Sequence, residues 1–533
     1  MTTVTPPAIS SPAELFRQVR SSMVLAQANT VLFERPDRLP RALAAALPFG
    51  TGLLAALAAS AARYPEVVAV TGPGESMTYR AMWRETDAQA RGLRAEGISS
   101  STKVGILHRN SPMFVRSLVA AAKLGADVVL LNTAMSGPQL DDVIVAESVT
   151  AVLGDDDLIA LLPPRDGVTH VDTARLWDLA ATGSPGRLKP PPREGRMVIL
   201  TSGTTGTPKG AARSAGTNAL DAAASVLASI PFRARDTIVI PSPFFHAWGL
   251  NGLLLGLGMS ATIVTTPTFR AVDTLTQIDR YRADGLIVVP TMLQRICDTD
   301  PAVLAQFDTG TLRYLGSSGS AISPDLVTEV LDRFGPVLYN IYGSTEVALA
   351  TVAGPADLRR FPTTAGRRVP GVGVMVLDDA GRPVPDGTVG RIFVANSFRF
   401  DGYTNGATKE SAAGGLSSGD KGYFDPDGRL FIVGREDDMI VSGGENIYPL
   451  EVENLLVADE RIVEAAVVGI PHESFGQVLK AIIVVADGHE LTTDDVRDLV
   501  ASRLARYKVP KVIEFTDALP RTATGKLLRR KMI

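Results

Sequence analysis

Residues 199–210 read Ile-Leu-Thr-Ser-Gly-Thr-Thr-Gly-Thr-Pro-Lys-Gly, and the rest of the chain is organised around them. The apolar run at residues 197–200 predicts a buried strand, which breaks into a segment made only of threonine, serine, glycine, one proline and one lysine. Glycines let backbone N–H groups converge on an anion, while the hydroxyls add donors and Lys209 adds a positive charge. A flexible surface loop is the plain alternative for such a composition. The pattern favours a loop that binds a polyphosphate.

The residues around the lysine separate this loop from one common class of nucleotide-binding proteins. A Walker A loop needs Gly-Lys followed by Ser or Thr, whereas Lys209 is followed by Gly210, so an ordinary P-loop NTPase fits poorly. Residues 201–210 instead resemble the phosphate-binding signature of the adenylate-forming enzymes, which include acyl-CoA synthetases, peptide-synthetase adenylation domains and beetle luciferases. The resemblance implies a catalytic, Mg²⁺-binding role for Thr201 and contacts to ATP from Thr201, Ser202, Gly203, Thr204, Thr205, Gly206 and Lys209.

A second signature lies at residues 339–346, Tyr-Asn-Ile-Tyr-Gly-Ser-Thr-Glu. Tyr342 offers a ring face for a purine, Thr345 a hydroxyl for a phosphate, and Glu346 a hard oxygen ligand for Mg²⁺. The alternative is a strand-end turn in which the hydroxyl and the acid cap a helix. The segment also resembles the family's motif, which implies a catalytic metal-binding role for Glu346 and nucleotide contacts for Tyr342, Gly343, Ser344 and Thr345.

Residues 316–321, Gly-Ser-Ser-Gly-Ser-Ala, follow a predicted strand. Their small side chains would let a flat purine ring approach the backbone closely. The family usually has a Gly/Ala-rich version with proline, so Ser320 departs mildly from its pattern. The predicted adenine contacts are Gly319, Ser320 and Ala321.

Asp420 and Arg435 match two positions that contact ribose in the family. A carboxylate can accept both ribose hydroxyl protons, and a guanidinium can donate to the same edge. The family commonly has Trp and Thr before that aspartate, where residues 416–418 are Leu-Ser-Ser. Because the aspartate itself is retained, its ribose role is kept in the prediction.

Residues 244–249, Phe-Phe-His-Ala-Trp-Gly, place a histidine among aromatic side chains. Such a histidine is commonly a core residue satisfied by one hydrogen bond, but the family's aromatic-His motif helps line the acyl pocket, which also suggests a catalytic role. Trp248 resembles a gate residue of long-chain fatty acyl-CoA synthetases, with plain packing as the alternative. The implied pocket offers no counter-charge to an ammonium group, which argues for a fatty or aromatic acid over an amino acid. Its members are His246, Trp248, Ile341, Gly343, Ala348 and Leu349.

Two segments near the C-terminus also resemble family motifs. An acidic run is ordinarily a solvated turn, but the resemblance makes Asp437 the hinge about which a small domain swings. Ser442 and Gly443 would then lie beside the pantetheine of CoA. An exposed lysine near a chain end is ordinarily just solvated, whereas residues 520–526, Pro-Arg-Thr-Ala-Thr-Gly-Lys, match the motif that makes Lys526 catalytic.

The predicted fold class is α/β. Alternating strands and helices between residues 77 and 131 indicate parallel βαβ units in a large N-terminal domain of mixed and parallel sheets with flanking helices. Residues 371–435 resemble the family's small β subdomain, and residues 451–515 read as a small, mobile α+β C-terminal domain. The predicted bounds are 1–45 for a partly disordered or helical extension, 46–435 for the adenylation domain and 436–533 for the C-terminal domain.

Composition narrows the class of protein further. The 533 residues, 45% hydrophobic and 21% charged, are ordinary for a soluble globular protein, and the net charge of −4 argues against nucleic acid as a partner. One cysteine and no signal-peptide or membrane-spanning pattern predict a cytoplasmic protein. Residues 12–57 read as helices on the outside of the domain or as a membrane-surface helix. Peripheral membrane contact and a homodimer therefore stay open.

The resemblance predicts ATP-dependent activation of a medium- or long-chain fatty acid to acyl-AMP with release of pyrophosphate, followed by thioesterification to CoA. ATP, Mg²⁺ and CoA are the implied cofactors. The alternatives are an acyl-AMP ligase that loads a carrier protein, an aromatic-acid CoA ligase and, from another class, a non-catalytic nucleotide-binding protein. An oxidative, luciferase-type activity has no support beyond the shared signatures.

Overall fold

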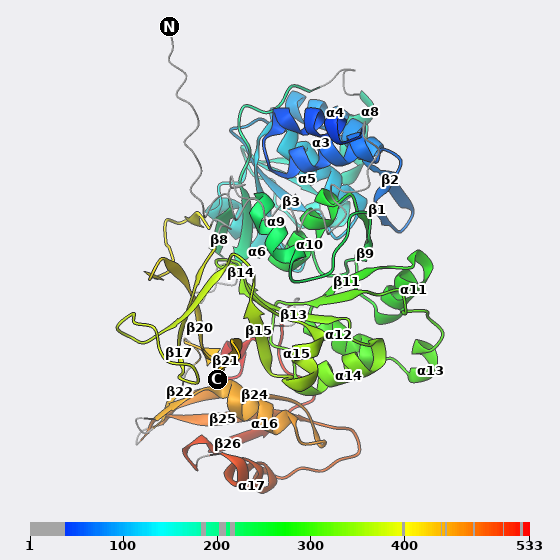
Figure 1. The fold of residues 1–533 in the computed structure, drawn as a ribbon. Coiled ribbons are helices and arrows are strands. Elements are labelled where there is room, and N and C mark those ends of the chain that lie inside the picture. Colours follow the sequence, from blue (N-terminus) through cyan, green and yellow to red (C-terminus); the bar gives the residue numbers. More distant parts are fainter. Residues whose placement is uncertain are drawn as a thin grey trace.

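The computed structural model describes residues 38–182, 188–201, 209–213, 219–396, 400–436, 438, 440–442, 445–472, 475–504, 506–522 and 526–533. These residues form three β-sheets with helices packed against them (Figure 1). Two larger sheets come from the N-terminal part of the chain, and a five-stranded sheet from the C-terminal part lies at the bottom of Figure 1. The α/β architecture of a large and a small domain is confirmed, while the boundaries at residues 45 and 435 stay predictions.

The glycine- and threonine-rich segment leaves a seven-stranded sheet. In spatial order its strands are β6 (Thr169–Val171), β5 (Ala151–Gly154), β3 (Lys103–Leu107), β4 (Asp127–Leu130), β7 (Met197–Thr201), β8 (Lys209–Arg213) and β18 (Gly402–Tyr403). The strands from β6 to β7 run parallel, and β8 and β18 are antiparallel additions at one edge. The central strands are apolar runs buried along their length, as a sheet covered on both faces requires.

The largest sheet joins a parallel half to an antiparallel half. In spatial order its strands are β16 (Gly373–Leu377), β17 (Gly390–Ala395), β20 (Gly415–Phe424), β21 (Arg429–Arg435), β15 (Thr364–Arg368), β14 (Ala348–Ala353), β13 (Leu338–Ser344), β12 (Tyr314–Ser317), β11 (Gly285–Val288), β9 (Thr237–Val239), β10 (Thr262–Val264), β1 (Val68–Gly72) and β2 (Glu75–Thr78), with β19 (Ser411–Ala412) beside β20. From β13 to β1 neighbouring strands are parallel. The β13–β14 hairpin reverses direction, and every later pair is antiparallel. The strands predicted as a small β subdomain therefore continue this sheet.

Helices cover the faces of the larger sheets (Figure 1). They are α2 (Arg38–Ala46), α3 (Leu53–Arg63), α4 (Tyr79–Ala95), α5 (Pro112–Leu124), α6 (Gly137–Ala146), α7 (Asp156–Ile159), α8 (Thr173–Thr182), α9 (Ala219–Leu227), α10 (Ala247–Gly258), α11 (Ala271–Tyr281), α12 (Pro290–Cys297), α13 (Pro301–Leu304), α14 (Pro324–Phe334) and α15 (Pro355–Arg360). Helix α5 contacts β3 and β4 of one sheet and β1 and β2 of the other, so it is packed between them. Its bounds follow from its sequence: the Ser111 hydroxyl accepts the Phe114 N–H at its start, and Gly125 ends it with a φ of 73°.

The C-terminal domain has its own sheet and core. Its elements are β22 (Ile440–Ser442), β23 (Glu445–Ile447), α16 (Pro449–Val457), β24 (Ile462–His472), β25 (Gly476–Val485), α17 (Thr493–Arg503) and β26 (Val512–Phe515). From α16 to β26 these elements follow the order helix, two strands, helix, strand, as the sequence predicts. The apolar face of the sheet packs on α16 and α17, which gives the domain an independent hydrophobic cluster.

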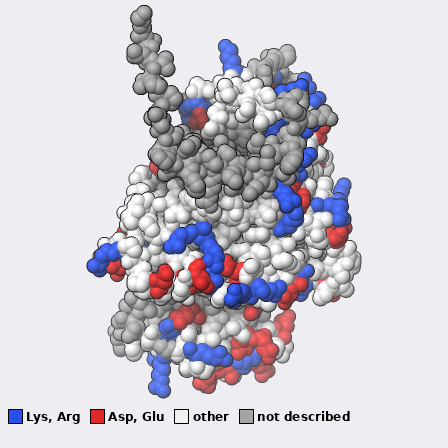
Figure 2. All heavy atoms as spheres, viewed as in Figure 1, with Lys and Arg blue, Asp and Glu red and all other residues white. Residues whose placement is uncertain are grey.

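The described surface carries charges of both signs, and the lone cysteine is buried. Basic and acidic side chains are interspersed on the face viewed in Figure 2. Within the described residues, no helix combines the length and the apolar content that crossing a bilayer requires. Cys297 is 1% exposed, and burial raises the pKa of its thiol to about 12.

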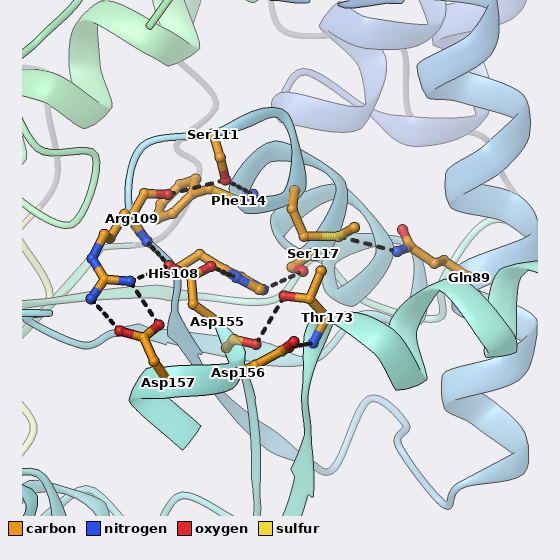
Figure 3. Close-up of polar contacts among 12 residues, drawn as sticks. Gln89, His108, Arg109, Ser111, Phe114, Ser117, Asp155, Asp156, Asp157 and Thr173 are labelled. Atoms are coloured by element: carbon orange, nitrogen blue, oxygen red, sulfur yellow. Dashed lines mark hydrogen bonds and ion pairs between the residues drawn. The ribbon is translucent and has the colours of Figure 1, made fainter. Parts of the chain in front are cut away.

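A buried polar cluster joins β3 to β5 (Figure 3). His108 Nδ1 lies 2.7 Å from Asp155 Oδ1, and His108 Nε2 lies 3.0 Å from Ser117 Oγ. The Arg109 guanidinium donates to Asp155 and also to Asp157. The serine–histidine–aspartate order is that of a hydrolase triad, but His108 and Ser117 are fully buried, so no substrate could reach the hydroxyl. The cluster is structural.

Asp155→Ala is expected to lower the free energy of unfolding by roughly 1–3 kcal/mol, because it leaves the His108 ring and the Arg109 backbone N–H without their acceptor, while the Arg109 guanidinium keeps Asp157. Burial raises the pKa of Asp155, but hydrogen bonds from His108 and Arg109 outweigh it and keep that pKa below its usual range. The carboxylate's contribution is therefore present at neutral pH and lost as the pH falls through the lowered pKa. Urea unfolding at neutral and acidic pH measures both effects.

Asp157→Ala is the matched control. Its side chain is 66% exposed and pairs with the same Arg109, so its loss should cost less than about 1 kcal/mol. Equal destabilisation by the two substitutions would contradict the structural role given to the buried cluster.

Candidate active site

A continuous cleft is lined by both larger sheets and by the C-terminal domain. Its walls include the carboxyl ends of β7, β12 and β13, the start of α10 and the β20–β21 hairpin. Carboxyl ends of parallel strands are where open α/β sheets commonly bind ligands. The cleft brings together residues from both predicted signatures and from the chain end, namely Thr201, Lys209, Glu346, Asp420, Arg435 and Lys526.

The predicted phosphate loop starts and ends on a hairpin pair. Thr201 ends β7 and Lys209 begins β8, and the two residues face each other across the antiparallel pair. The Thr201 hydroxyl donates to the Lys209 carbonyl oxygen at 3.1 Å. Both residues line the cleft, and their contact with phosphate stays a prediction. The remaining members of the loop lie outside the described residues; they are Ser202, Gly203, Thr204, Thr205 and Gly206.

The second signature forms the turn between β13 and β14. The Ser344 hydroxyl accepts the backbone N–H of Glu346 and donates to Glu346 Oε2 at 2.9 Å. Gly343 is required by close packing, because a Cβ there would lie 1.7 Å from the Ala348 carbonyl oxygen. Ala348 has a φ of 54°, in the left-handed region that favours glycine. The turn holds Glu346 at the wall of the cleft, with Thr345 beside it.

Tyr403 also holds Glu346, although the sequence analysis does not single it out. Its hydroxyl donates to Glu346 Oε1 at 2.5 Å. Burial raises the pKa of Glu346, but the hydrogen bonds from Tyr403 and Ser344, with the charge of Lys409, leave that pKa below its usual range. The carboxylate is therefore ionised at neutral pH. A two-residue strand such as β18 leaves no periodic signal, so only its pairing with β8 reveals the position of Tyr403.

The predicted ribose residues lie beside Tyr342, in the middle of the β13 signature. The Tyr342 hydroxyl donates to Asp420 Oδ2 at 2.5 Å and lies 3.0 Å from the Ser418 hydroxyl. Burial, and then the charge of Asp420, raise the pKa of Tyr342, which stays neutral. Asp420 and Arg435 are directly opposite each other on β20 and β21. One part of the cleft is thus lined by the Tyr342 ring, the Asp420 carboxylate and the Arg435 guanidinium.

The segment after β12 lies beside Tyr342. The Ser318 hydroxyl donates to the Ile341 carbonyl oxygen at 2.8 Å, which ties this segment to β13. Gly319 has a φ of 97°, a conformation that side chains disfavour. All three predicted adenine contacts line the cleft, and the contact with adenine itself stays a prediction; they are Gly319, Ser320 and Ala321.

His246 immediately precedes α10 and packs on Phe245, with 4.4 Å between the ring centres. Its Nε2 is buried and has no hydrogen-bond partner among the described residues. Burial lowers the pKa of His246 to about 4, so the ring is neutral at pH 7. It lines the cleft together with the other predicted pocket residues, Trp248, Ile341, Gly343, Ala348 and Leu349.

The Trp248 ring is held in the wall of the pocket by a hydrogen bond and by close packing. Its indole N–H donates to the Val288 carbonyl oxygen at 2.9 Å. Its ring lies against Gly316, where a Cβ would be 3.0 Å from the indole. Because the hydrogen bond and the close packing hold the ring in place, this geometry favours a fixed wall over a moving gate.

Lys526 reaches the cleft from the C-terminal domain. Its backbone N–H donates to the Thr522 hydroxyl at 3.1 Å, and its carbonyl oxygen accepts the Thr522 N–H at 2.8 Å, so the two residues close a tight turn. Ser442 is buried in β22 and does not line the cleft. Asp437 and Gly443 lie outside the described residues. The hinge and the CoA contacts therefore stay predictions.

Two family models match the chain. The model of the AMP-binding enzymes matches residues 57–404, and that of the AMP-binding enzyme C-terminal domain matches residues 451–526. The chain belongs to the AMP-binding enzymes. This is the adenylate-forming superfamily whose motifs the sequence resembles, and the chain is an AMP-forming acid ligase of that family.

The similar proteins match this AMP-binding enzyme over most of its length. An indoleacetate–CoA ligase of Aromatoleum aromaticum is 33% identical over 87% of this chain and 94% of its own length. A long-chain-fatty-acid–CoA ligase of Mycobacterium tuberculosis is 30% identical over 85% of this chain and 92% of its own. The o-succinylbenzoate CoA synthetase of Bacillus subtilis, solved with its acyl-adenylate intermediate, superposes with a TM-score of 0.78 at 26% identity, covering 90% of this chain and 97% of that one.

Ligases of this family use ATP, Mg²⁺ and CoA. Among the described residues, no cluster of three or more His, Cys, Asp or Glu side chains could hold a metal ion by itself. An ionised Glu346, in a cleft that the Thr201 hydroxyl also lines, suits Mg²⁺, which usually takes one or two carboxylates and completes its shell with phosphate oxygens and water. The donor set therefore fits a cation that arrives with a nucleotide.

Tyr403→Phe is expected to raise the pKa of Glu346, because hydrogen bonds to a carboxylate favour its ionised form. The acidic limb of the pH profile of ATP–pyrophosphate exchange should then move to higher pH. The rate at neutral pH should fall roughly tenfold, as the loss of about 1.5 kcal/mol from a hydrogen bond to a charged group implies. Tyr339→Phe, which changes a tyrosine outside the cleft lining, is the control. An unshifted acidic limb in the Tyr403 variant would contradict the assignment.

Proposed function

We propose that this protein activates a medium- or long-chain fatty acid with ATP, forming acyl-AMP and pyrophosphate, and then transfers the acyl group to CoA. The observation that carries the proposal is an apolar groove that continues the cleft beyond His246. Burying an alkyl chain in such a groove is favourable by about 0.8 kcal/mol per methylene. The groove is built mainly from α3, α9 and α10.

The groove wall follows one face of α10. Ala247, Leu254, Leu255 and Gly258 line it at helical spacing, and Asn251 adds an uncharged amide. Facing them are small or apolar side chains of two other helices, which are Ala56 and Ala59 of α3 and Ala223 and Val226 of α9. None of these side chains is charged, although Arg63 and Glu194 line the same cleft, and the apolar helix faces support an apolar acid over an amino acid.

We assign the first half-reaction to the groups around Glu346. A carboxylate is a poor acylating agent because its leaving group would be an oxide, and transfer of AMP to it supplies a stabilised phosphate leaving group instead. An oxygen of the acid attacks the α-phosphorus of ATP, and the bond from that phosphorus to the pyrophosphate oxygen breaks. Two anions approach each other, so Lys526 and Lys209 are proposed to stabilise the developing charge. Glu346 and Thr201 would hold Mg²⁺, which neutralises phosphate charge.

The nucleotide itself is assigned to the groups around Tyr342. Its ring face would stack on adenine, with Gly319, Ser320 and Ala321 along the purine edge. Asp420 and Arg435 would bind the ribose hydroxyls. The phosphates would take their hydrogen bonds from Ser344, Thr345 and the loop at residues 201–206.

We assign the second half-reaction to a reorientation of the C-terminal domain about Asp437, which would bring Ser442 and Gly443 to CoA. The CoA thiol then attacks the acyl carbon, and the bond from that carbon to the AMP oxygen breaks. The neutral His246 stands at the entry to the groove, where it would face the reacting carboxyl group.

Two alternatives have specific support. The indoleacetate–CoA ligase relative favours an aromatic acid, which would occupy only the part of the pocket beside Trp248. A carrier protein could replace CoA as acceptor, since the first half-reaction is unchanged. An aromatic acid would leave the distal part of the groove unfilled, whereas a carrier-protein ligase would use the same groove and differ only in its acceptor.

AMP release coupled to each candidate acid tests the proposed function. Hexadecanoate and dodecanoate should give a higher kcat/KM than indoleacetate or ferulate, because only the alkyl chain fills the groove. Release should require free CoA. A preference for the aromatic acids would overturn the fatty-acid assignment, and AMP release that needs a carrier protein would overturn CoA as acceptor.

Lys526→Ala should slow acyl-AMP formation by about 10²–10³, the usual cost of removing one charge-stabilising contact. Thioester formation from preformed acyl-AMP and CoA should stay near the wild-type rate. Lys511→Ala changes a lysine of the same domain that does not line the cleft, and it should affect neither step. Equal loss of both half-reactions in the Lys526 variant would contradict its proposed role.

A further inference from the structure

Helix α2 lies over the distal end of the apolar groove. Leu39, Ala42, Leu43 and Ala46 recur at helical spacing and all line it. Leu43 is 57% exposed, so it presents apolar surface that an alkyl chain could cover. The helix precedes residue 57, where the match to the family model begins, so this cover lies outside the residues that the model matches.

Helix α2 is tied to the body of the domain at its first residue. The Arg38 guanidinium lies 5.3 Å from the centre of the Tyr64 ring, just after the end of α3. Arg63 and Arg235 lie 5.2 Å and 5.3 Å from the same ring. Cation–π contacts of this kind stabilise the pairing of α2 with α3, which also pack along their lengths. The cover over the groove is therefore an ordered helix.

Gly258 leaves open space in the wall of the groove. A Cβ added at Gly258, the last residue of α10, would meet only the Ala56 methyl group, at 3.7 Å. The neighbouring wall is also made of small residues, Ala56 and Ala59. From His246 at one end to Gly258 at the other, the twelve residues of α10 extend about 18 Å. That length suits a long-chain acyl group and exceeds any single aromatic ring.

We propose that α2 and the end of α10 form a distal subsite for the terminal methylenes of the acyl group, and that the space above Gly258 sets the longest chain accepted. The inference rests on the proposed function, since it needs an aliphatic substrate. A larger side chain at position 258 would fill the subsite and leave the groove near His246 unchanged. A charge at position 43 would place an ammonium group against the chain terminus.

The test compares octanoate and hexadecanoate in CoA-dependent AMP release. Gly258→Leu and Leu43→Lys should each lower kcat/KM for hexadecanoate at least tenfold while octanoate stays within twofold of wild type. The octanoate rate reports folding of each variant. Gly258→Ala is the matched control for the first site, because its added methyl group makes only an ordinary contact with Ala56.

Leu47→Lys is the matched control for the second site. Leu47 follows α2 and is 79% exposed, but it does not line the groove, so its substitution should leave both acids unaffected. An unaltered chain-length profile in Gly258→Leu would overturn the inference, and so would equal losses in the Leu43 and Leu47 variants, which would indicate a surface effect such as membrane contact.

The chain-length profile of the wild-type enzyme distinguishes failure of the proposed function from failure of the distal subsite. A wild-type enzyme that activates indoleacetate and neither aliphatic acid would overturn the proposed function and the distal subsite with it. A wild-type enzyme that prefers hexadecanoate, with variants that keep this preference, would overturn the subsite alone.

Discussion

The hydrogen bond from the Tyr403 hydroxyl to Glu346 joins the two larger sheets at the cleft. Tyr403 belongs to the edge of the seven-stranded sheet, whereas Glu346 follows β13 of the largest sheet. Within the largest sheet, the turn that carries Glu346 is held by Asn396, whose side-chain amide donates to the Val347 carbonyl oxygen at 2.6 Å. The carboxylate proposed to bind Mg²⁺ is thus positioned by hydrogen bonds from both sheets.

Much of this arrangement could be predicted from the sequence, because the two signatures contain both the residues and their order along parallel strands. Thr201 ends β7 of the seven-stranded sheet, while Tyr342 lies near the end of β13 in the largest sheet and Glu346 follows that strand. The contribution of Tyr403 could not be predicted, since a two-residue strand has no periodicity and its partner strand is almost two hundred residues away. The continuation of the largest sheet into β16, β17, β20 and β21 was missed for a related reason. Which distant strands pair depends on tertiary packing, and local sequence patterns do not show it.

Two histidines show how hydrogen-bond satisfaction separates structural from functional roles. His108 is fully buried and has a hydrogen-bond partner on each ring nitrogen, so neither nitrogen is available to a ligand. His246 is held among aromatic rings, and its Nε2 lacks a partner among the described residues. A buried polar atom without a partner is costly, and it is commonly retained where a ligand completes the hydrogen bond. Both histidines follow short apolar runs, so the sequence alone could not distinguish them.

The inert state of Cys297 makes the chain a ready background for spectroscopic labelling. It is the single cysteine of the sequence, and neither solvent nor a thiol reagent has ready access to its buried, protonated sulfur. A cysteine introduced on the outer face of α17 and another on α11 would therefore be the only reactive thiols. Dyes attached to that pair would report the distance between the large and the small domain in solution, and so show as a change in energy transfer whether the proposed reorientation accompanies turnover, with the native cysteine kept in place.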